Sequence, residues 1–394
     1  MSSHIAALVK IIDGTSFFWE KTEMRSFFLI SAACLVSFAA SAQVPAPATL
    51  KDAYRRAFVV GAAINEAQIR GWDKRGDAIV TQQFNSITPE NAMKWENIHP
   101  QPDRYDFSLA DKFVEFGLKN HMFIVGHNLC WHSQTPGWVF KDDKGKPIGR
   151  EALLERLHSH IRTVVGRYKG KIDSWDVVNE ALNEDGTLRQ SPWLKIIGDD
   201  YIVKAFEFAH EADPGAQLNY NDYNLETPAK RKGAIALVKR LQAAGVPIAV
   251  VGDQAHLSID TLSIPTEEAT IEELAASGVK VAITELDINV LPTTWKQTAD
   301  VSLSVANADP KMNPYVNGLP DDVQKKLTEA YGDLFTLFWK DRAVMSRVTL
   351  WGVMDGDSWL NNWPAVGRTS YPLLFDRSGK PKPAFFAALN AVKN

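Results

Sequence analysis

Cysteine is almost absent from this chain, which has only Cys34 and Cys130 among its 394 residues. Cys34 falls in an N-terminal segment that we expect to be removed, so the mature protein would keep Cys130 alone. A single cysteine excludes an internal disulfide, even in an oxidising compartment. We interpret Cys130, which follows the predicted strand 123–129, as a small buried hydrophobic residue without a functional role.

The sequence also lacks the features by which several protein classes bind their ligands. It has no run of Lys or Arg, and its formal net charge of -4 offers no basic surface to a nucleic-acid backbone. No predicted strand is followed by a glycine-rich turn that would hold a dinucleotide. The His and Cys residues do not have zinc-site spacing, and His127 and His132 are separated across a loop. We therefore expect no nucleic acid, no cofactor and no metal.

A long apolar run near the N-terminus is missing as well. The apolar stretch 27–40 is too short to span a bilayer comfortably, since a helix needs about 20 residues. It follows Arg25 and ends at the small-residue triplet 40–42. This pattern predicts a secretory signal peptide that is cleaved before Gln43, and hence a secreted, periplasmic or extracellular, protein.

Residues 1–23 carry acidic side chains, which the start of a signal peptide normally lacks, so we expect the true start at Met24. A lipid anchor on Cys34 is the alternative, although Ser31 stands where such sites usually carry Leu. The predicted organisation is an N-terminal extension and signal peptide at 1–42, a short Pro/Ala leader at 43–52 and one catalytic domain at 53–394.

Short apolar runs alternate with helical patterns from residue 58 onward. Helical periodicity is clearest at 150–168 and 323–340, and strands separated by helices pair in parallel. Eight such units predict an α/β fold of the (β/α)8 TIM-barrel type in a single domain, with a doubly wound open sheet as the alternative. The long loop 289–320 follows the seventh strand. The predicted strands are 58–64, 84–91, 123–129, 174–180, 217–222, 248–256, 281–288 and 348–353.

Polar and aromatic side chains gather at the carboxyl ends of these strands, where a barrel of this type assembles its active site. Glu180 ends the fourth strand and Glu285 ends the seventh, and twelve Trp residues supply apolar faces on which sugar rings can stack. Two facing carboxylates in a Trp-lined crevice are what cleavage of a glycosidic bond requires, because one must be protonated and the other ionised.

Six segments of the sequence resemble the signatures of a known family, in the same order along the chain. The family is glycoside hydrolase family 10, the retaining endo-β-1,4-xylanases, and the resemblance runs from about residue 53 to the C-terminus. The segments are ENAMKWE (90–96), GHNLCWHSQTPGW (126–138), WDVVNEA (175–181), DQAHL (253–257), ITELDI (283–288) and WGVMDGDSWL (351–360).

The resemblance implies a role for each matching residue. Glu180 would be the general acid/base and Glu285 the nucleophile, with Asp287 orienting His256 as a supporting residue. The substrate would be xylan or xylo-oligosaccharide, and the enzyme is expected to be a monomer with no membrane contact after cleavage. The implied substrate-binding residues are Glu90, Asn91, Lys94, His127, Trp131, Asn179, Tyr223, Gln254, His256, Trp351 and Trp359.

Two other functions remain open at this stage. A barrel glycosidase that cuts cellulose or mannan would carry a similar glutamate pair. A xylanase would differ from it by crowding the C5 edge of the sugar, and Trp351 and Trp359 are the residues that we expect to do this. A carbohydrate-binding module without activity would keep the Trp residues and lose the carboxylates. Both Glu180 and Glu285 are present, which favours an enzyme.

Overall fold

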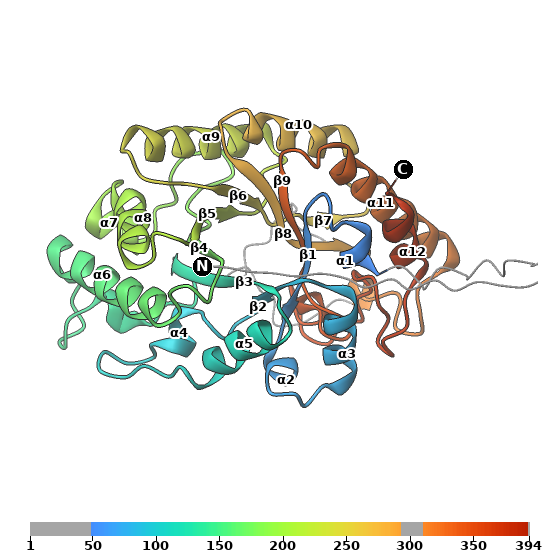
Figure 1. Ribbon diagram of the computed structural model, residues 1–394, viewed down its shortest axis with the longest axis horizontal. Helices are drawn as coiled ribbons and strands as arrows, with labels where there is room; N and C mark the ends of the chain where they lie inside the picture. Colours follow the sequence, from blue (N-terminus) through green and yellow to red (C-terminus); the bar gives the residue numbers. More distant parts are fainter. Residues whose placement is uncertain (1–48, 293–309, 393–394) are drawn as a thin grey trace, which may run out of the picture. The chain divides into compact units, whose positions relative to one another are not determined.

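The computed structural model describes residues 49–292 and 310–392, which are drawn in colour in Figure 1. The predicted signal peptide, most of the leader and the central part of the loop 289–320 lie outside the described residues. The strands within the described ranges are β1 (Val59–Ile64), β2 (Ser86–Pro89), β3 (Phe123–Trp131), β4 (Ser174–Asn179), β5 (Gln217–Asp222), β6 (Val250–Asp253), β7 (His256–Ser258), β8 (Lys280–Asn289) and β9 (Met345–Leu350).

The strands form one closed parallel barrel. Each strand from β1 to β5 pairs with the next, β6 pairs with β8, β8 with β9, and β9 returns to β1. The short strand β7 pairs with the far end of β8 and continues the position of β6. Eight strand positions therefore close the ring, which confirms the predicted (β/α)8 barrel and rules out the open sheet.

Helices connect the strands and surround the barrel (Figure 1). The helix α11 shows why: its buried side chains recur at three- and four-residue steps from Leu327 to Phe338, so one stripe faces the barrel. The α-helices are α1 (Leu50–Ala53), α2 (Glu66–Ile69), α3 (Lys74–Gln83), α4 (Trp95–Ile98), α5 (Ser108–Lys119), α6 (Arg150–Arg167), α7 (Pro192–Ile197), α8 (Tyr201–Ala212), α9 (Pro228–Ala243), α10 (Ile264–Ala275), α11 (Asp321–Lys340) and α12 (Pro383–Asn390). Short 3-10 turns are η1 (Gly137–Phe140), η2 (Pro310–Met312) and η3 (Trp359–Asn361).

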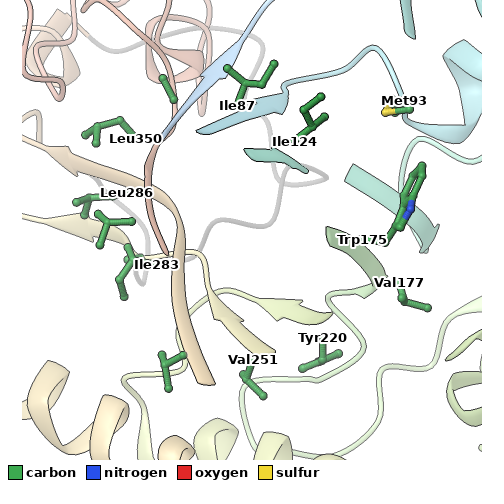
Figure 2. Close-up of a cluster of buried hydrophobic side chains, with 14 of the residues drawn as sticks. Ile87, Met93, Ile124, Trp175, Val177, Tyr220, Val251, Ile283, Leu286 and Leu350 are labelled. Carbon is green, nitrogen blue, oxygen red and sulfur yellow. The ribbon is translucent and has the colours of Figure 1, made fainter. Parts of the chain in front are cut away.

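The hydrophobic core lies between the strands and the helices. Successive side chains of a strand point to opposite faces, so every second residue can turn toward the helices. Figure 2 shows such side chains on several strands, among them Ile87 of β2, Trp175 and Val177 of β4, and Tyr220 of β5. All four are buried and belong to one continuous apolar cluster.

The intervening residues are polar and bond to one another within the barrel. Asn219 of β5 donates to Ser174 Oγ at 2.7 Å and to Asp176 Oδ1 at 3.1 Å on β4. Two residues further along β5, Asn221 accepts a hydrogen bond of 2.6 Å from the hydroxyl of Thr284 on β8. Gly252 of β6 makes room for this contact, because a Cβ at that position would overlap the Asn221 amide. The barrel interior thus holds a polar network that leads to the strand ends.

The predicted sixth strand, 248–256, is interrupted in the structure. It splits into β6 and β7 around Gln254 and Ala255, and Ala255 adopts a left-handed φ of 54°. The break turns the side chain of Gln254 toward Glu180, to which it donates a hydrogen bond. The departure from a regular strand therefore falls at a predicted site residue, as local strain often does.

Candidate active site

Two buried glutamates stand at the carboxyl-terminal end of the barrel. Glu180 follows the last residue of β4, Glu285 lies in β8, and each residue is 5% exposed. Glu180 has a φ of 56°, a left-handed conformation that is uncommon for a residue with a side chain. Its backbone amide donates to the carbonyl of Asn221 at 2.8 Å, which fixes this turn at the strand end.

A bridge of side-chain amides connects the two carboxylates. The Asn221 amide nitrogen donates to Glu285 Oε1 and to Asn179 Oδ1, both at 2.8 Å. Asn179 in turn donates to Glu180 Oε1 at 3.2 Å, and Gln254 donates to the same oxygen at 3.1 Å. Because Thr284 donates to the Asn221 oxygen, the orientation of the Asn221 amide is defined.

The environment raises the pKa of Glu180. Burial is the main cause, and the negative charge of Asp222 adds to it, while the hydrogen bond from Gln254 and the indole of Trp131 act in the opposite direction. The resulting pKa is about 7, against an ordinary value of 4.5. Glu180 is therefore protonated over much of the acidic and neutral range and can act as a general acid.

The environment of Glu285, in contrast, lowers the pKa of its carboxyl group. Burial alone would raise its pKa, but the hydrogen bond from His256 and the electrostatic influence of the nearby His127 and His256 imidazoles outweigh it, so the pKa lies below the ordinary value. The His256 Nε2 and Glu285 Oε2 atoms are 3.2 Å apart. Glu285 is thus kept ionised next to an acid that is kept protonated, which separates the roles of the two groups.

Asp287 and Trp359 hold His256 in place. The Asp287 Oδ1 atom lies 3.1 Å from His256 Nδ1, and its other oxygen accepts a hydrogen bond of 2.7 Å from the Trp359 indole. Burial would lower the pKa of His256, but Asp287 and Glu285 raise it to about 10. The imidazole is therefore protonated, and it forms an ion pair with each of the two carboxylates.

A lysine lies on the side of the site formed by β2 and β3. Lys94 Nζ donates to Asn91 Oδ1 at 2.9 Å and to Gln134 Oε1 at 2.8 Å, and it lies 5.1 Å from the centre of the Trp131 ring. Burial lowers the pKa of Lys94, while the charge of Glu90 opposes this shift. Burial raises the pKa of Glu90, against the charge of Lys94. These side chains offer hydrogen-bond donors and acceptors next to the Trp131 indole, an arrangement that can bind the hydroxyls and the apolar face of a sugar.

Trp351 lies next to both His127 and His256 in the site. His127 Nδ1 lies 3.0 Å from Asp176 Oδ2, an acid of the polar barrel interior. The Trp351 ring meets the His127 ring edge to face with centroids 5.5 Å apart, and the His256 ring in a similar way at 6.3 Å. Asp176 therefore holds His127 by one nitrogen, while the other lies 3.4 Å from the side-chain amide nitrogen of Asn128.

Tyr223 is more enclosed than its predicted stacking role suggests. Its side chain is 2% exposed, its hydroxyl accepts a hydrogen bond of 2.6 Å from Arg189, and Lys230 Nζ lies 3.5 Å from the ring centre. A cation thus occupies one face of the ring. Stacking of a sugar on Tyr223 would have to use the small surface that remains, and the role stays a prediction.

Of the residues predicted from the sequence, Asn179, Gln254 and His256 bond directly to the two glutamates. Trp351 contacts the rings of His127 and His256, and Lys94 forms a separate group with Asn91 and Trp131. Sequence reasoning missed Asn221, Asp176, Gln134 and Arg189, although Asn221 bonds directly to Glu285. A signal for Asn221 was present: in the stretch QLNYND its polar residues alternate with apolar ones, as on a strand with a polar inner face.

Other kinds of site find little support in the described part of the chain. Within residues 49–292 and 310–392, no cluster of three or more His, Cys, Asp or Glu side chains could hold a metal ion. Cys130 is buried at the end of β3, and burial raises the pKa of its thiol, which fits the predicted hydrophobic role. Among these same residues no helix has the length and apolar character needed to cross a bilayer.

The arrangement is suited to hydrolysis of a glycosidic bond. A protonated carboxylic acid and an ionised carboxylate lie in one buried site with amide, imidazole and ammonium groups that can bind hydroxyls, and with indole rings that can contact sugar faces.

Comparison with known proteins places the chain in a family. Residues 49–391 match the model of glycosyl hydrolase family 10. An "Endo-1,4-beta-xylanase A" of Xylanibacter ruminicola is 47% identical over 336 residues, covering 85% of this chain and 91% of that protein.

Solved structures agree with this result. A family 10 endoxylanase retrieved from a sugarcane soil metagenome is 48% identical with a TM-score of 0.83, covering 88% of this chain and 99% of that one. An intracellular xylanase from Thermoanaerobacterium saccharolyticum, in complex with xylotetraose, is 37% identical with a TM-score of 0.75, covering 86% and 97%. The chain therefore belongs to glycosyl hydrolase family 10.

Proposed function

We propose that this protein is an endo-1,4-β-xylanase that cleaves internal bonds of xylan with retention of configuration. One observation carries the proposal: two buried carboxyl groups, Glu180 and Glu285, have pKa values shifted in opposite directions within one hydrogen-bonded site. The similarity to endo-1,4-β-xylanases over most of the chain supports the choice of substrate.

The first chemical step uses both groups. Ionised Glu285 attacks the anomeric carbon and forms a glycosyl ester, while the bond to the leaving sugar breaks and Glu180 gives its proton to the departing oxygen. The hydrogen bonds from Asn221 and His256 hold Glu285 ionised and oriented for attack. Asn179 would donate to the 2-hydroxyl of the sugar at the cleavage point.

The second step reverses the roles. Once Glu285 is an ester it carries no charge, so it no longer raises the pKa of Glu180, which is now ionised. Glu180 removes a proton from water, the water oxygen attacks the anomeric carbon, and the ester bond to Glu285 breaks. Two displacements at one carbon return the original β configuration.

The role of Glu180 is tested with leaving groups of different acidity. Glu180→Gln should reduce kcat on unactivated xylo-oligosaccharide by about 10² to 10⁴ but leave the first step nearly intact on a dinitrophenyl xyloside, whose leaving group needs no proton. Glu285→Gln should abolish turnover of both substrates. The matched control is Glu329→Gln on the surface of α11, which should leave both rates unchanged. Equal losses on both substrates for Glu180→Gln would contradict its role as acid.

Specificity for xylan rests on the aromatic wall formed by Trp351 and Trp359. We propose that these rings crowd the C5 edge of the sugar, where xylose lacks the hydroxymethyl group of glucose and mannose. Initial rates on xylan, cellulose and mannan should therefore differ strongly in favour of xylan. Equal rates on xylan and cellulose would support a barrel glycosidase of another specificity.

We also propose that the chain is exported and acts as a monomer. The support is the signal-peptide pattern at residues 24–42, with Met24 as the true start. N-terminal sequencing of the protein recovered outside the cytoplasm should begin at Gln43, and light scattering should give the mass of one chain. A protein that keeps residues 1–23 would contradict the proposed start.

A further inference from the structure

A groove of about 530 Å³ lies on the outer surface of the barrel, between α2, α3 and α5. The helix α2 packs against both of the others, and the three lie together in Figure 1. None of the residues that line the groove belongs to the site around Glu180 and Glu285. Its volume falls in the range of ligand pockets, about 300–1,000 Å³.

A tryptophan stands at the edge of this groove. Trp72 follows Gly71, one of the lining residues, and its side chain is 70% exposed, unlike the other Trp side chains within residues 49–292 and 310–392. The Arg70 guanidinium lies over the ring at 5.2 Å from its centre and is held by Glu66 at 2.6 Å. The guanidinium thus lies beside one face of the indole, while most of the side chain faces solvent. An exposed indole is suited to stack against the flat face of a sugar.

Polar partners lie beside the ring. A Cβ built on Gly71 would be 3.1 Å from Lys74 Nζ and 3.8 Å from Asp77 Oδ2, so both side chains reach the groove next to Trp72. The other Asp77 oxygen is buried and has no hydrogen-bond partner among the described residues. Beside Gly71, the Asp77 Oδ2 acceptor and the Lys74 ammonium donor together match a sugar hydroxyl, which both donates and accepts.

The groove begins close to the active-site loops. Gln68, one of its lining residues, donates to Asp357 Oδ2 at 3.0 Å, and Asp357 lies between Trp351 and Trp359 in the chain. A polymer longer than the catalytic cleft could therefore leave the cleft beside this loop and continue along α2.

We propose that this groove, with Trp72 as its stacking platform and Lys74 and Asp77 as its polar partners, is a second binding site for a β-1,4-linked xylan chain. The inference rests on the proposed function, because it takes xylan as the substrate. It assigns Trp72 to retention of the polymer and gives it no part in the chemical step.

The test separates binding of the polymer from catalysis. Affinity for xylan is measured by retardation in native gels that contain soluble xylan, using the full chain with Glu285→Ala so that nothing is hydrolysed. Trp72→Ala and Asp77→Asn are compared with Phe386→Ala, which removes a half-exposed aromatic ring from α12. The same three changes with Glu285 intact are assayed on a short xylo-oligosaccharide.

The expected result is a loss of xylan affinity of about three- to tenfold for Trp72→Ala, a smaller loss for Asp77→Asn and none for Phe386→Ala. Rates on the short substrate should stay within about twofold for all three. Retardation of Trp72→Ala equal to that of Phe386→Ala would overturn the inference, as would an equal loss on the short substrate. Failure of the proposed function is seen separately, as absence of xylan hydrolysis by the unchanged protein.

Discussion

Asn221→Ala tests how the barrel interior controls the catalytic pair. Asn221 is fully buried and gives its two amide hydrogens to Glu285 and Asn179 at 2.8 Å each. A hydrogen bond to a charged group is worth about 1.5–3 kcal/mol. Losing it should lower kcat/KM on xylo-oligosaccharide roughly ten- to a hundredfold. The pKa of Glu285 should also rise, so the acidic limb of the pH–rate profile moves to higher pH.

The matched control is Asn219→Ala. Asn219 lies two residues earlier on β5, is equally buried and bonds to Ser174 and Asp176 without touching either catalytic carboxylate. Both changes should destabilise the fold by about 1–3 kcal/mol, since each leaves buried polar groups unpaired. Only Asn221→Ala should move the acidic limb in initial-rate assays. An unshifted limb for Asn221→Ala, or an equal shift for Asn219→Ala, would refute the reasoning.

Three further predictions follow from the same structure. Because the pKa of Glu180 is near 7 and that of Glu285 is lowered, a plot of kcat/KM against pH should be bell-shaped. It should fall on the alkaline side as Glu180 loses its proton and on the acidic side as Glu285 gains one. A profile that stays flat from about pH 5 to about pH 9 would contradict this. Burial and neighbouring carboxylates raise the pKa of Asp253 to about 8, so its contribution to stability is full below its ordinary pKa of 3.8 and is lost as pH rises toward about 8. In calorimetry, the Tm of Asp253→Asn should therefore fall less than that of the unchanged protein as the pH rises through this range. Parallel plots of Tm against pH would argue against the raised pKa of Asp253. Gly252→Ala should lower the free energy of unfolding in urea by about 1–3 kcal/mol because its Cβ overlaps Asn221 and Thr284, whereas Gly137→Ala, which meets nothing, should change it little; equal effects would be inconsistent with the packing.

The sequence was sufficient to predict the barrel and to name candidate site residues, whose roles stay predictions. Strand and helix periodicity predicted eight units, and the helices at 150–168 and 323–340 agree with α6 and α11 to within two residues at either end. Residues at strand ends were found because parallel strands deliver their carboxyl ends to one rim. Glu180, Gln254 and Glu285 were identified by that rule.

Features that depend on contacts between distant segments were harder to predict. Asn221 was missed because it lies within a strand, and its bonds to Asn179 and Glu285 join residues 42 and 64 positions away. The break around Ala255 was missed because no Gly or Asn stands at that position to indicate the left-handed φ that Ala255 adopts. The enclosure of Tyr223 depends on Arg189 and Lys230, which the local sequence does not place beside it.

The measurement that tests the mechanism most directly is the configuration of the first product. Proton NMR on linear xylo-oligosaccharide, recorded within the first turnovers, should show the new reducing end in the β form, which then converts slowly to the α form in solution. This result is predicted because Glu285 is ionised and positioned to form a covalent intermediate while Glu180 is protonated. An α product formed first would mean a single displacement by water, and it would contradict the assignment of Glu285 as nucleophile.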